Sequence, residues 1–180
     1  MGTGEDYGDR PDLLNRLRGY LNSPREERTA APYRPPVIFI VHGHDLAFRD
    51  EVATAVRDWV PGCQVQILES EPKRARTVIG ALVQILPEAD FIIALATGDD
   101  LVRPRDRPRA KATLAARPNV IFEVGAAAMT SVRWMLVKDP GVQLPSDLAG
   151  VLYEPRDQWR AAVLRELRDA GLPVDPDATA

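Results

Sequence analysis

Two continuous apolar runs constrain the fold of this chain most strongly. Val37–Val41 reads VIFIV and Phe91–Ala96 reads FIIALA, and neither run contains a polar residue. Strands that are buried on both faces have this composition, whereas a strand with one solvated face alternates apolar and polar residues. A sheet buried on both faces needs helices on both sides, which proteins build by alternating strands with helices. The runs therefore predict an α/β fold around a parallel sheet.

The rest of the chain continues this alternation. Apolar residues spaced three or four apart predict helices over 52–59, 78–85, 119–128 and 159–167. Shorter apolar or alternating segments predict further strands at 64–68, 134–137 and 151–153. With right-handed crossovers, we expect a five-stranded parallel sheet flanked by helices, in the flavodoxin-like order 2-1-3-4-5.

The predicted domain spans residues 37–173, between an N-terminal extension and a short tail over 174–180. Within the extension, 1–36, apolar residues at helical spacing predict one short helix over 13–21, followed by a proline-rich linker. That helix either packs on its own domain or docks a partner. Cys63 is the single cysteine, so no disulfide framework forms within the chain. No apolar run approaches the roughly 20 residues of a membrane span, and the first residues are polar and acidic. We expect a cytoplasmic protein with no membrane partner.

Polar clusters follow the first and third predicted strands. Ligands of such sheets bind at the carboxyl ends of the strands where strand order reverses, here between those two strands. The helix after the third strand starts at the same edge, with Asn119 and Glu123 four residues apart on one face. Topology therefore predicts one neighbourhood for the cluster residues and this helix start: His42, Gly43, His44, Asp45, Thr97, Asp99, Asp100, Asn119 and Glu123.

Each part of that neighbourhood has a structural alternative. Asp45 suits the N-cap of the next helix as well as a ligand role, and Asp99 and Asp100 suit a turn. His42 and His44 are the only histidines, so a metal site would need carboxylates, and none is predicted. The segment 102–117 holds six basic residues against one acid. It is either a solvated loop or a pyrophosphate contact through Arg109 or Arg117.

Several enzyme and ligand classes lack their sequence signals. The chain has no Gly-x-Gly-x-x-Gly fingerprint, no P-loop and no Gly-x-Ser-x-Gly elbow. A phosphorelay receiver would need an acidic pair after the first strand, where this chain has His-Gly-His. The formal net charge of −3 also argues against general nucleic-acid binding.

Five motifs in order, IFIVHGHD, RTVIGAL, FIIALATGDD, ARPNVIFEVG and LPSDLAGVLY, carry a family resemblance over about 37–170. The chain resembles the bacterial Toll/interleukin-1-receptor-like (TIR-like) predicted nucleotide-binding proteins. The resemblance implies a TIR-type fold and an anti-phage effector similar to enzymes that hydrolyse NAD⁺ once a cyclic nucleotide signal drives them to assemble. It assigns catalysis to Glu123 and nucleotide contacts to 42–45 and 97–100. It further implies a homo-oligomer through TIR–TIR contacts, with NAD⁺ as substrate and no required cofactor.

The chain departs from the family pattern at Gly80, at Pro118 and over 126–129, which bears on the shape of the sugar pocket. The main alternative function is a non-catalytic nucleotide-sensing or protein-interaction module. A deoxyribosyltransferase-like enzyme is a third possibility, because it also acts on an N-glycosidic bond with a carboxylate. For an NAD⁺ hydrolase, one carboxylate beside the ribose would stabilise the developing positive charge. Arg109, Arg117 and backbone N–H groups near Gly43 are then expected to hold phosphates.

Overall fold

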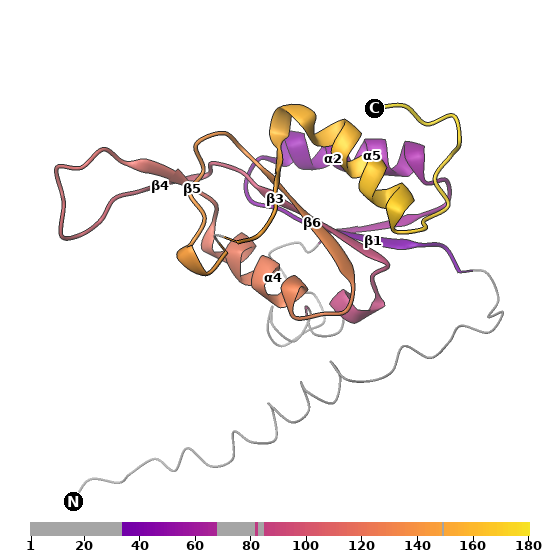
Figure 1. Cartoon of the computed structure of the whole chain (residues 1–180), viewed down its shortest axis with the longest axis horizontal. Coiled ribbons are helices and arrows are strands. Elements are labelled where there is room, and N and C mark those ends of the chain that lie inside the picture. The colour runs from indigo at the N-terminus through magenta and orange to yellow at the C-terminus, as the bar shows by residue number, and fades with distance from the viewer. Residues whose placement is uncertain (1–33, 68–81, 83–84, 149) are drawn as a thin grey trace, which may run out of the picture. The chain divides into compact units, whose positions relative to one another are not determined.

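The computed structural model describes residues 34–67, 82, 85–148 and 150–180. A five-stranded sheet in the order β2-β1-β3-β6-β7 lies at its centre (Figure 1). Its strands are β1 (Val37–Val41), β2 (Gln64–Ile67), β3 (Phe91–Ala96), β6 (Arg133–Lys138) and β7 (Glu154–Pro155). Every neighbouring pair is parallel. The predicted order 2-1-3-4-5 is confirmed, because β6 and β7 are the fourth and fifth strands of this sheet.

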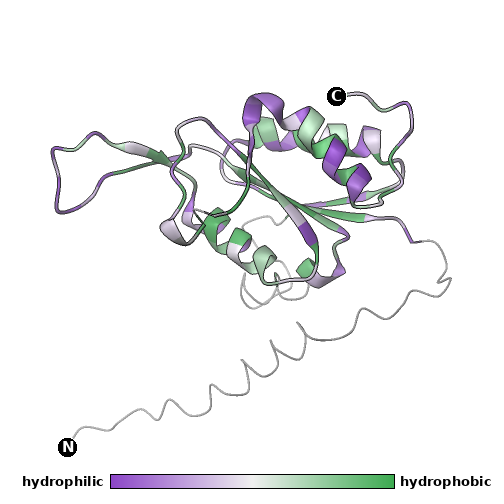
Figure 2. Cartoon of the chain, in the orientation of Figure 1, coloured by the Kyte–Doolittle hydropathy of each residue, from purple (hydrophilic) through white to green (hydrophobic). Residues whose placement is uncertain are grey.

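Helices cover both faces of the sheet, which explains the two uninterrupted apolar runs. Helices α2 (Leu46–Trp59) and α5 (Trp159–Asp169) lie side by side over one face, and α4 (Pro118–Ala128) covers the other (Figure 1). Ile38 and Ile40 of β1 pack toward α2 and α5, while Phe39 and Val41 pack toward α4. The hydrophobic colouring of Figure 2 follows the strands and the helix sides turned toward them. Short 3₁₀ turns occur at η1 (Leu86–Glu88), η2 (Ser146–Leu148) and η3 (Arg156–Gln158).

Two features differ from the sequence prediction. The fifth strand was expected at 151–153 but lies at Glu154–Pro155, where it pairs with Val137 and Lys138. Of the apolar residues that suggested the earlier position, Leu152 and Tyr153 are exposed, with Leu152 at 93%, and Val151 is half-buried against the core. In addition, β4 (Asp100–Val102) and β5 (Thr113–Ala115) form an antiparallel hairpin that was not predicted. Its strands are three residues long, too short for periodicity to detect.

The C-terminal segment contacts the domain that precedes it. The Trp59 indole N–H donates to the Thr179 carbonyl at 3.0 Å, and the Asp175 N–H donates to the Trp59 carbonyl at 2.8 Å. Residues 174–180, separated above as a tail, therefore lie in the same compact unit as the sheet, Pro35–Ala180. The helix predicted over 13–21 and most of that over 78–85 lie outside the described residues. No helix in the described ranges is both long and apolar enough to cross a membrane.

Candidate functional site

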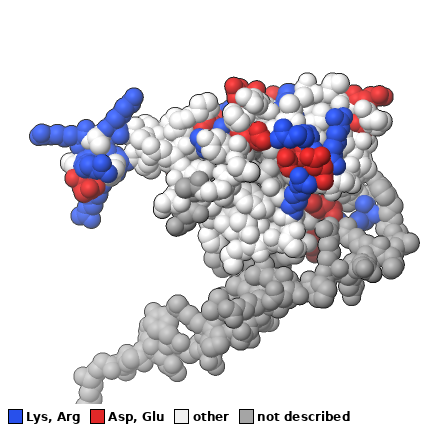
Figure 3. Space-filling model, viewed as in Figure 1, with Lys and Arg blue, Asp and Glu red and all other residues white. Residues whose placement is uncertain are grey.

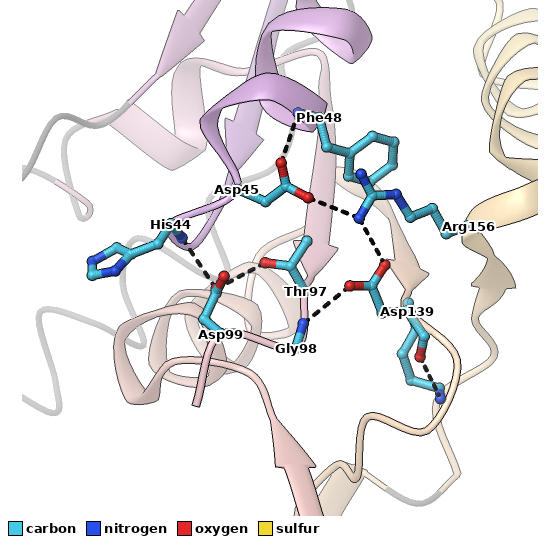
Figure 4. Close-up of polar contacts among 9 residues, drawn as sticks. His44, Asp45, Phe48, Thr97, Gly98, Asp99, Asp139 and Arg156 are labelled. Atoms are coloured by element: carbon cyan, nitrogen blue, oxygen red, sulfur yellow. Dashed lines mark hydrogen bonds and ion pairs between the residues drawn. The ribbon is translucent and has the colours of Figure 1, made fainter. Parts of the chain in front are cut away.

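Asp99 joins the loop after β1 to the end of β3 (Figure 4). Its Oδ2 atom accepts hydrogen bonds from the Thr97 hydroxyl at 2.8 Å and from the His44 backbone N–H at 3.1 Å. The same oxygen lies so close to the backbone at Gly43 that a Cβ there would sit 1.8 Å away, so any other residue at this position would displace the Asp99 carboxylate. The structure thus brings Gly43, His44, Thr97 and Asp99 together, as the strand order predicted. Since the His44 N–H already has a carboxylate partner, it is not free for a phosphate.

Asp45 takes the structural role that the sequence left open beside a ligand role. It is the N-cap of α2, and its Oδ1 atom accepts from the Phe48 backbone N–H at 3.0 Å. Its Oδ2 atom lies 2.8 Å from the guanidinium of Arg156. The Phe48 N–H and then Arg156 hold the pKa of this carboxyl below its usual value. Asp45 is therefore a fully partnered anion at the edge where β1 ends.

Arg156 and Asp139, which no sequence motif marks, belong to the same edge. Arg156 reaches Asp139 Oδ1 at 3.1 Å, and Asp139 Oδ2 accepts from the Gly98 backbone N–H at 3.1 Å (Figure 4). The guanidinium lies 3.9 Å from the centre of the Phe48 ring. No motif marked these residues, because each becomes informative only once β6 and α5 are placed beside α2.

His42, the residue before Gly43, has one ring nitrogen that is bonded to the backbone and one that is buried without a partner among the described residues. Its Nδ1 atom lies 2.7 Å from the Gly43 carbonyl oxygen, so Nδ1 must carry the proton. Burial lowers the pKa of the imidazole, which favours the neutral ring. Its Nε2 atom is then a bare acceptor, and it is buried with no hydrogen-bond partner among the described residues. Within the described ranges, no cluster of His, Cys, Asp and Glu side chains has the arrangement of a metal site.

The remaining candidate residues surround the start of α4 and the hairpin. Arg117, the residue before α4, forms an ion pair of 3.3 Å with Asp100 of β4. Asn119 is exposed in the first turn. Arg109 is exposed in the loop between β4 and β5. Lys and Arg cover the end of this hairpin, which projects from the sheet (Figures 1 and 3). The structure thus pairs Arg117 with an acid and leaves Arg109 outside the bonded network at the strand ends.

Glu123 lies on the face of α4 that is turned toward the sheet. Its buried neighbours on this stripe are Val120, Val124 and Ala127, and the glutamate itself is 7% exposed. Thr97 and Glu123 are the buried polar side chains of the described residues, and only Glu123 is ionisable. Burial raises the pKa of its carboxyl to about 7. No described side chain or backbone group forms a hydrogen bond or ion pair with it, so Glu123 is not bonded to the strand-end cluster either.

The arrangement has two chemically different parts. At the strand ends, acids are bound by an arginine, a hydroxyl and backbone N–H groups, and this makes the loops rigid. Beneath α4, one carboxyl is largely buried and has no partner among the described residues, and burial raises its pKa to about 7. Groups whose pKa is shifted in this way are characteristic of sites that handle protons or developing charge.

Comparison with known proteins identifies the family. Residues 37–158, from β1 to η3, match the family model described as "CAP12/Pycsar effector protein, TIR domain". The chain is also 34% identical over 145 residues to a protein of Escherichia coli (strain K12) named "Uncharacterized protein YuaY". This match covers 78% of the chain and 47% of YuaY, so the chain spans about half the length of that curated relative. With the sheet order, α4 and the strand-end cluster all inside the matched range, this chain belongs to the TIR-domain family of CAP12/Pycsar effector proteins.

Proposed function

We propose that this TIR domain hydrolyses NAD⁺ at the bond between nicotinamide and ribose, with Glu123 as the catalytic carboxylate. The observation that carries the proposal is the state of Glu123: buried, unpaired among the described residues, and with a pKa raised to about 7. An unpaired buried ionisable group destabilises a fold. A ligand that supplies the missing partner would explain the presence of this glutamate on the apolar stripe of α4.

The chemistry of NAD⁺ fits such a group. When the glycosidic bond breaks, its electron pair leaves with the nicotinamide nitrogen, which loses its positive charge and departs as a neutral base. Positive charge then develops at ribose C1′, where a carboxylate in a low-dielectric site stabilises it strongly. The oxygen of a water molecule adds to C1′ and releases one proton, giving ADP-ribose. Because the leaving group is already cationic, no general acid is needed, and a single carboxylate suffices.

The bound substrate would also shift Glu123 toward its ionised form. A cation close to a carboxyl favours the charged form and lowers its pKa. The cationic nicotinamide ring would therefore bring the carboxyl from half-ionised near pH 7 toward the fully ionised form that the reaction requires.

Family membership supports an activation step as part of this proposal. The family name refers to Pycsar effectors, which implies a cyclic nucleotide signal. We propose that this signal acts by driving TIR–TIR assembly, which completes the site around Glu123. Isolated protein without the signal is then expected to be slow.

The test is product analysis on the full chain. Wild type, Glu123→Gln and the matched control Glu51→Gln, an exposed acid on α2, are incubated with NAD⁺, with and without cyclic mononucleotides. Nicotinamide and ADP-ribose are then measured by mass spectrometry. We expect release by wild type and Glu51→Gln and a loss of at least about a hundredfold in Glu123→Gln. Equal turnover by all three proteins would remove Glu123 from catalysis, and binding without nicotinamide release would identify a nucleotide sensor.

A further inference from the structure

One arginine holds three loops of the sheet edge in fixed positions. Arg156 lies in η3, just before α5, and its guanidinium contacts Asp45 at 2.8 Å and Asp139 at 3.1 Å. Asp45 caps the helix after β1, and Asp139 follows β6 and binds the Gly98 N–H after β3 at 3.1 Å. Figure 4 shows the continuous path from α2 through Arg156 to the end of β3. The ends of β1, β3 and β6 are thus connected through a single side chain.

The guanidinium combines two kinds of contact. Its Nη1 atom alone binds both carboxylates, at 2.8 Å to Asp45 and 3.1 Å to Asp139, and its plane lies 3.9 Å from the centre of the Phe48 ring. A lysine ammonium could supply a charged donor to the two acids, but it has no planar face to lie against Phe48. Arg156, Asp45 and Asp139 are each partly solvent-exposed, at 34%, 29% and 19% of their side chains. Partly exposed pairs contribute little to global stability, so the main consequence of the network is local.

The network complements the direct bond between the same loops. Asp99 connects the end of β3 to the His44 N–H. Arg156 makes a second connection beside it, because it binds Asp45 directly and reaches Gly98 through Asp139. The segments 42–45 and 97–100 are therefore fixed at two consecutive points. Removing Arg156 would leave only the Asp99 contact and two neighbouring acids, Asp45 and Asp139, without their shared cation.

We propose that Arg156 is a positioning residue of the active site: it sets the relative placement of the loops after β1 and β3 so that bound nucleotide meets Glu123 correctly. The expected loss of catalytic rate rests on the proposed NAD⁺ hydrolysis. The expected loosening of the two loops does not depend on that activity. Arg156 acts through Asp45 and Asp139 and needs no contact with substrate. Misplacement of substrate by about 1 Å is enough to cost up to about a hundredfold in rate.

Variants at two arginines of the same region separate positioning from general stability. Arg156→Met keeps an apolar stem over Phe48 but removes the charge, and Arg156→Lys keeps the charge but not the plane. Arg165→Met is the matched control, because Arg165 forms ion pairs with Glu154 of β7 at 2.6 Å and with Glu166 at 3.6 Å, and neither partner belongs to the link from Asp45 through Asp139 to Gly98. If Arg156→Met does not fold, Asp139→Asn tests the same link, since it weakens the bond to Arg156.

The first readout is hydrogen–deuterium exchange of the peptides that cover 42–48 and 96–100, which needs no activity. We expect faster exchange of both peptides in Arg156→Met, a smaller effect in Arg156→Lys, and wild-type exchange in Arg165→Met. The second readout is the steady-state kinetics of signal-activated protein with NAD⁺. There kcat/KM should fall by about tenfold or more in Arg156→Met, fall less in Arg156→Lys, and stay unchanged in Arg165→Met. Unchanged exchange in Arg156→Met would overturn the positioning role. If wild type releases no nicotinamide, the proposed function fails, and the exchange result alone decides the role of Arg156.

Discussion

Replacing Glu123 with glutamine should stabilise the protein, and the gain should depend on pH. The ordinary pKa of a glutamate is 4.5, and burial raises that of Glu123 to about 7. Between these values the unfolded chain releases the Glu123 proton while the folded chain retains it. The unfolded state then binds fewer protons, so the free energy of unfolding falls as pH rises through this window. Well below pH 4.5 both states are protonated and the effect vanishes.

The size of the effect follows from the two pKa values. Each pKa unit corresponds to about 1.4 kcal/mol, so a rise from 4.5 to about 7 costs the folded wild type about 3 kcal/mol at pH 8. Glutamine has nearly the same volume but cannot ionise, so Glu123→Gln escapes this loss. For a chain of 180 residues, about 3 kcal/mol corresponds to a Tm difference of roughly 6–12 °C.

Urea denaturation of wild type and Glu123→Gln at pH 5, 6, 7 and 8 measures the difference directly. The two proteins share every other titrating group, so subtraction isolates Glu123. We expect the variant to be more stable by less than about 1 kcal/mol at pH 5 and by about 3 kcal/mol at pH 8. Glu51→Gln controls for the loss of one surface charge and should show no such divergence. Parallel pH profiles for wild type and Glu123→Gln would refute the desolvated, unpaired state of Glu123 and with it the main support for its catalytic role.

Three further predictions concern the same site. The kcat/KM for NAD⁺ should rise with pH around an apparent pKa of about 7, because the proposed reaction requires Glu123 to be ionised in the free protein. A flat profile from pH 5.5 to 8.5 would contradict this. Gly43→Ala should lower the free energy of unfolding by about 1–3 kcal/mol in urea denaturation, because its Cβ would displace Asp99 from its partners. A smaller loss when Asp99→Ala is the background would identify that clash as the cause. Arg109→Ala should change the KM for NAD⁺ by no more than about twofold, because Arg109 is exposed on the hairpin loop. A large increase in KM would instead support the phosphate contact predicted for Arg109 from the sequence.

The sequence determined the central sheet because burial on both faces leaves a distinct signal. The bounds of β1 and β3 were predicted to the residue from runs without a polar side chain. The fifth strand was misplaced because an edge strand is defined by its pairing with β6, and Glu154 and Pro155 give no apolar signal. The hairpin was missed for a similar reason: its cross-strand pair of Leu101 and Leu114 lies on either side of a charged loop.

The sequence predicted those parts of the candidate site that strand order alone determines. Parallel order places the segments after β1 and β3 at one edge, and the contact of Asp99 with the His44 N–H follows from that placement. Side-chain pairing between distant elements has no such signature. Nothing in the sequence distinguishes Arg156 from the other basic residues until α5 and α2 are packed together. The burial of Glu123 could not be predicted either, because the identity of a glutamate does not show whether its side chain faces the sheet or the solvent.

Burial and hydrogen bonding together distinguish the structural carboxylates of this fold from Glu123, the functional candidate. Asp45, Asp99 and Asp139 lie at the sheet edge, and each has two donors among hydroxyl, guanidinium and backbone N–H groups. Glu123 is more buried than any of them and has no described donor. If burial of acids served stability alone, the most buried carboxyl should be the best partnered, because its desolvation is the most costly. The opposite distribution points to Glu123 as the acid whose partner arrives from solution, and a sugar with developing positive charge is a partner of that kind.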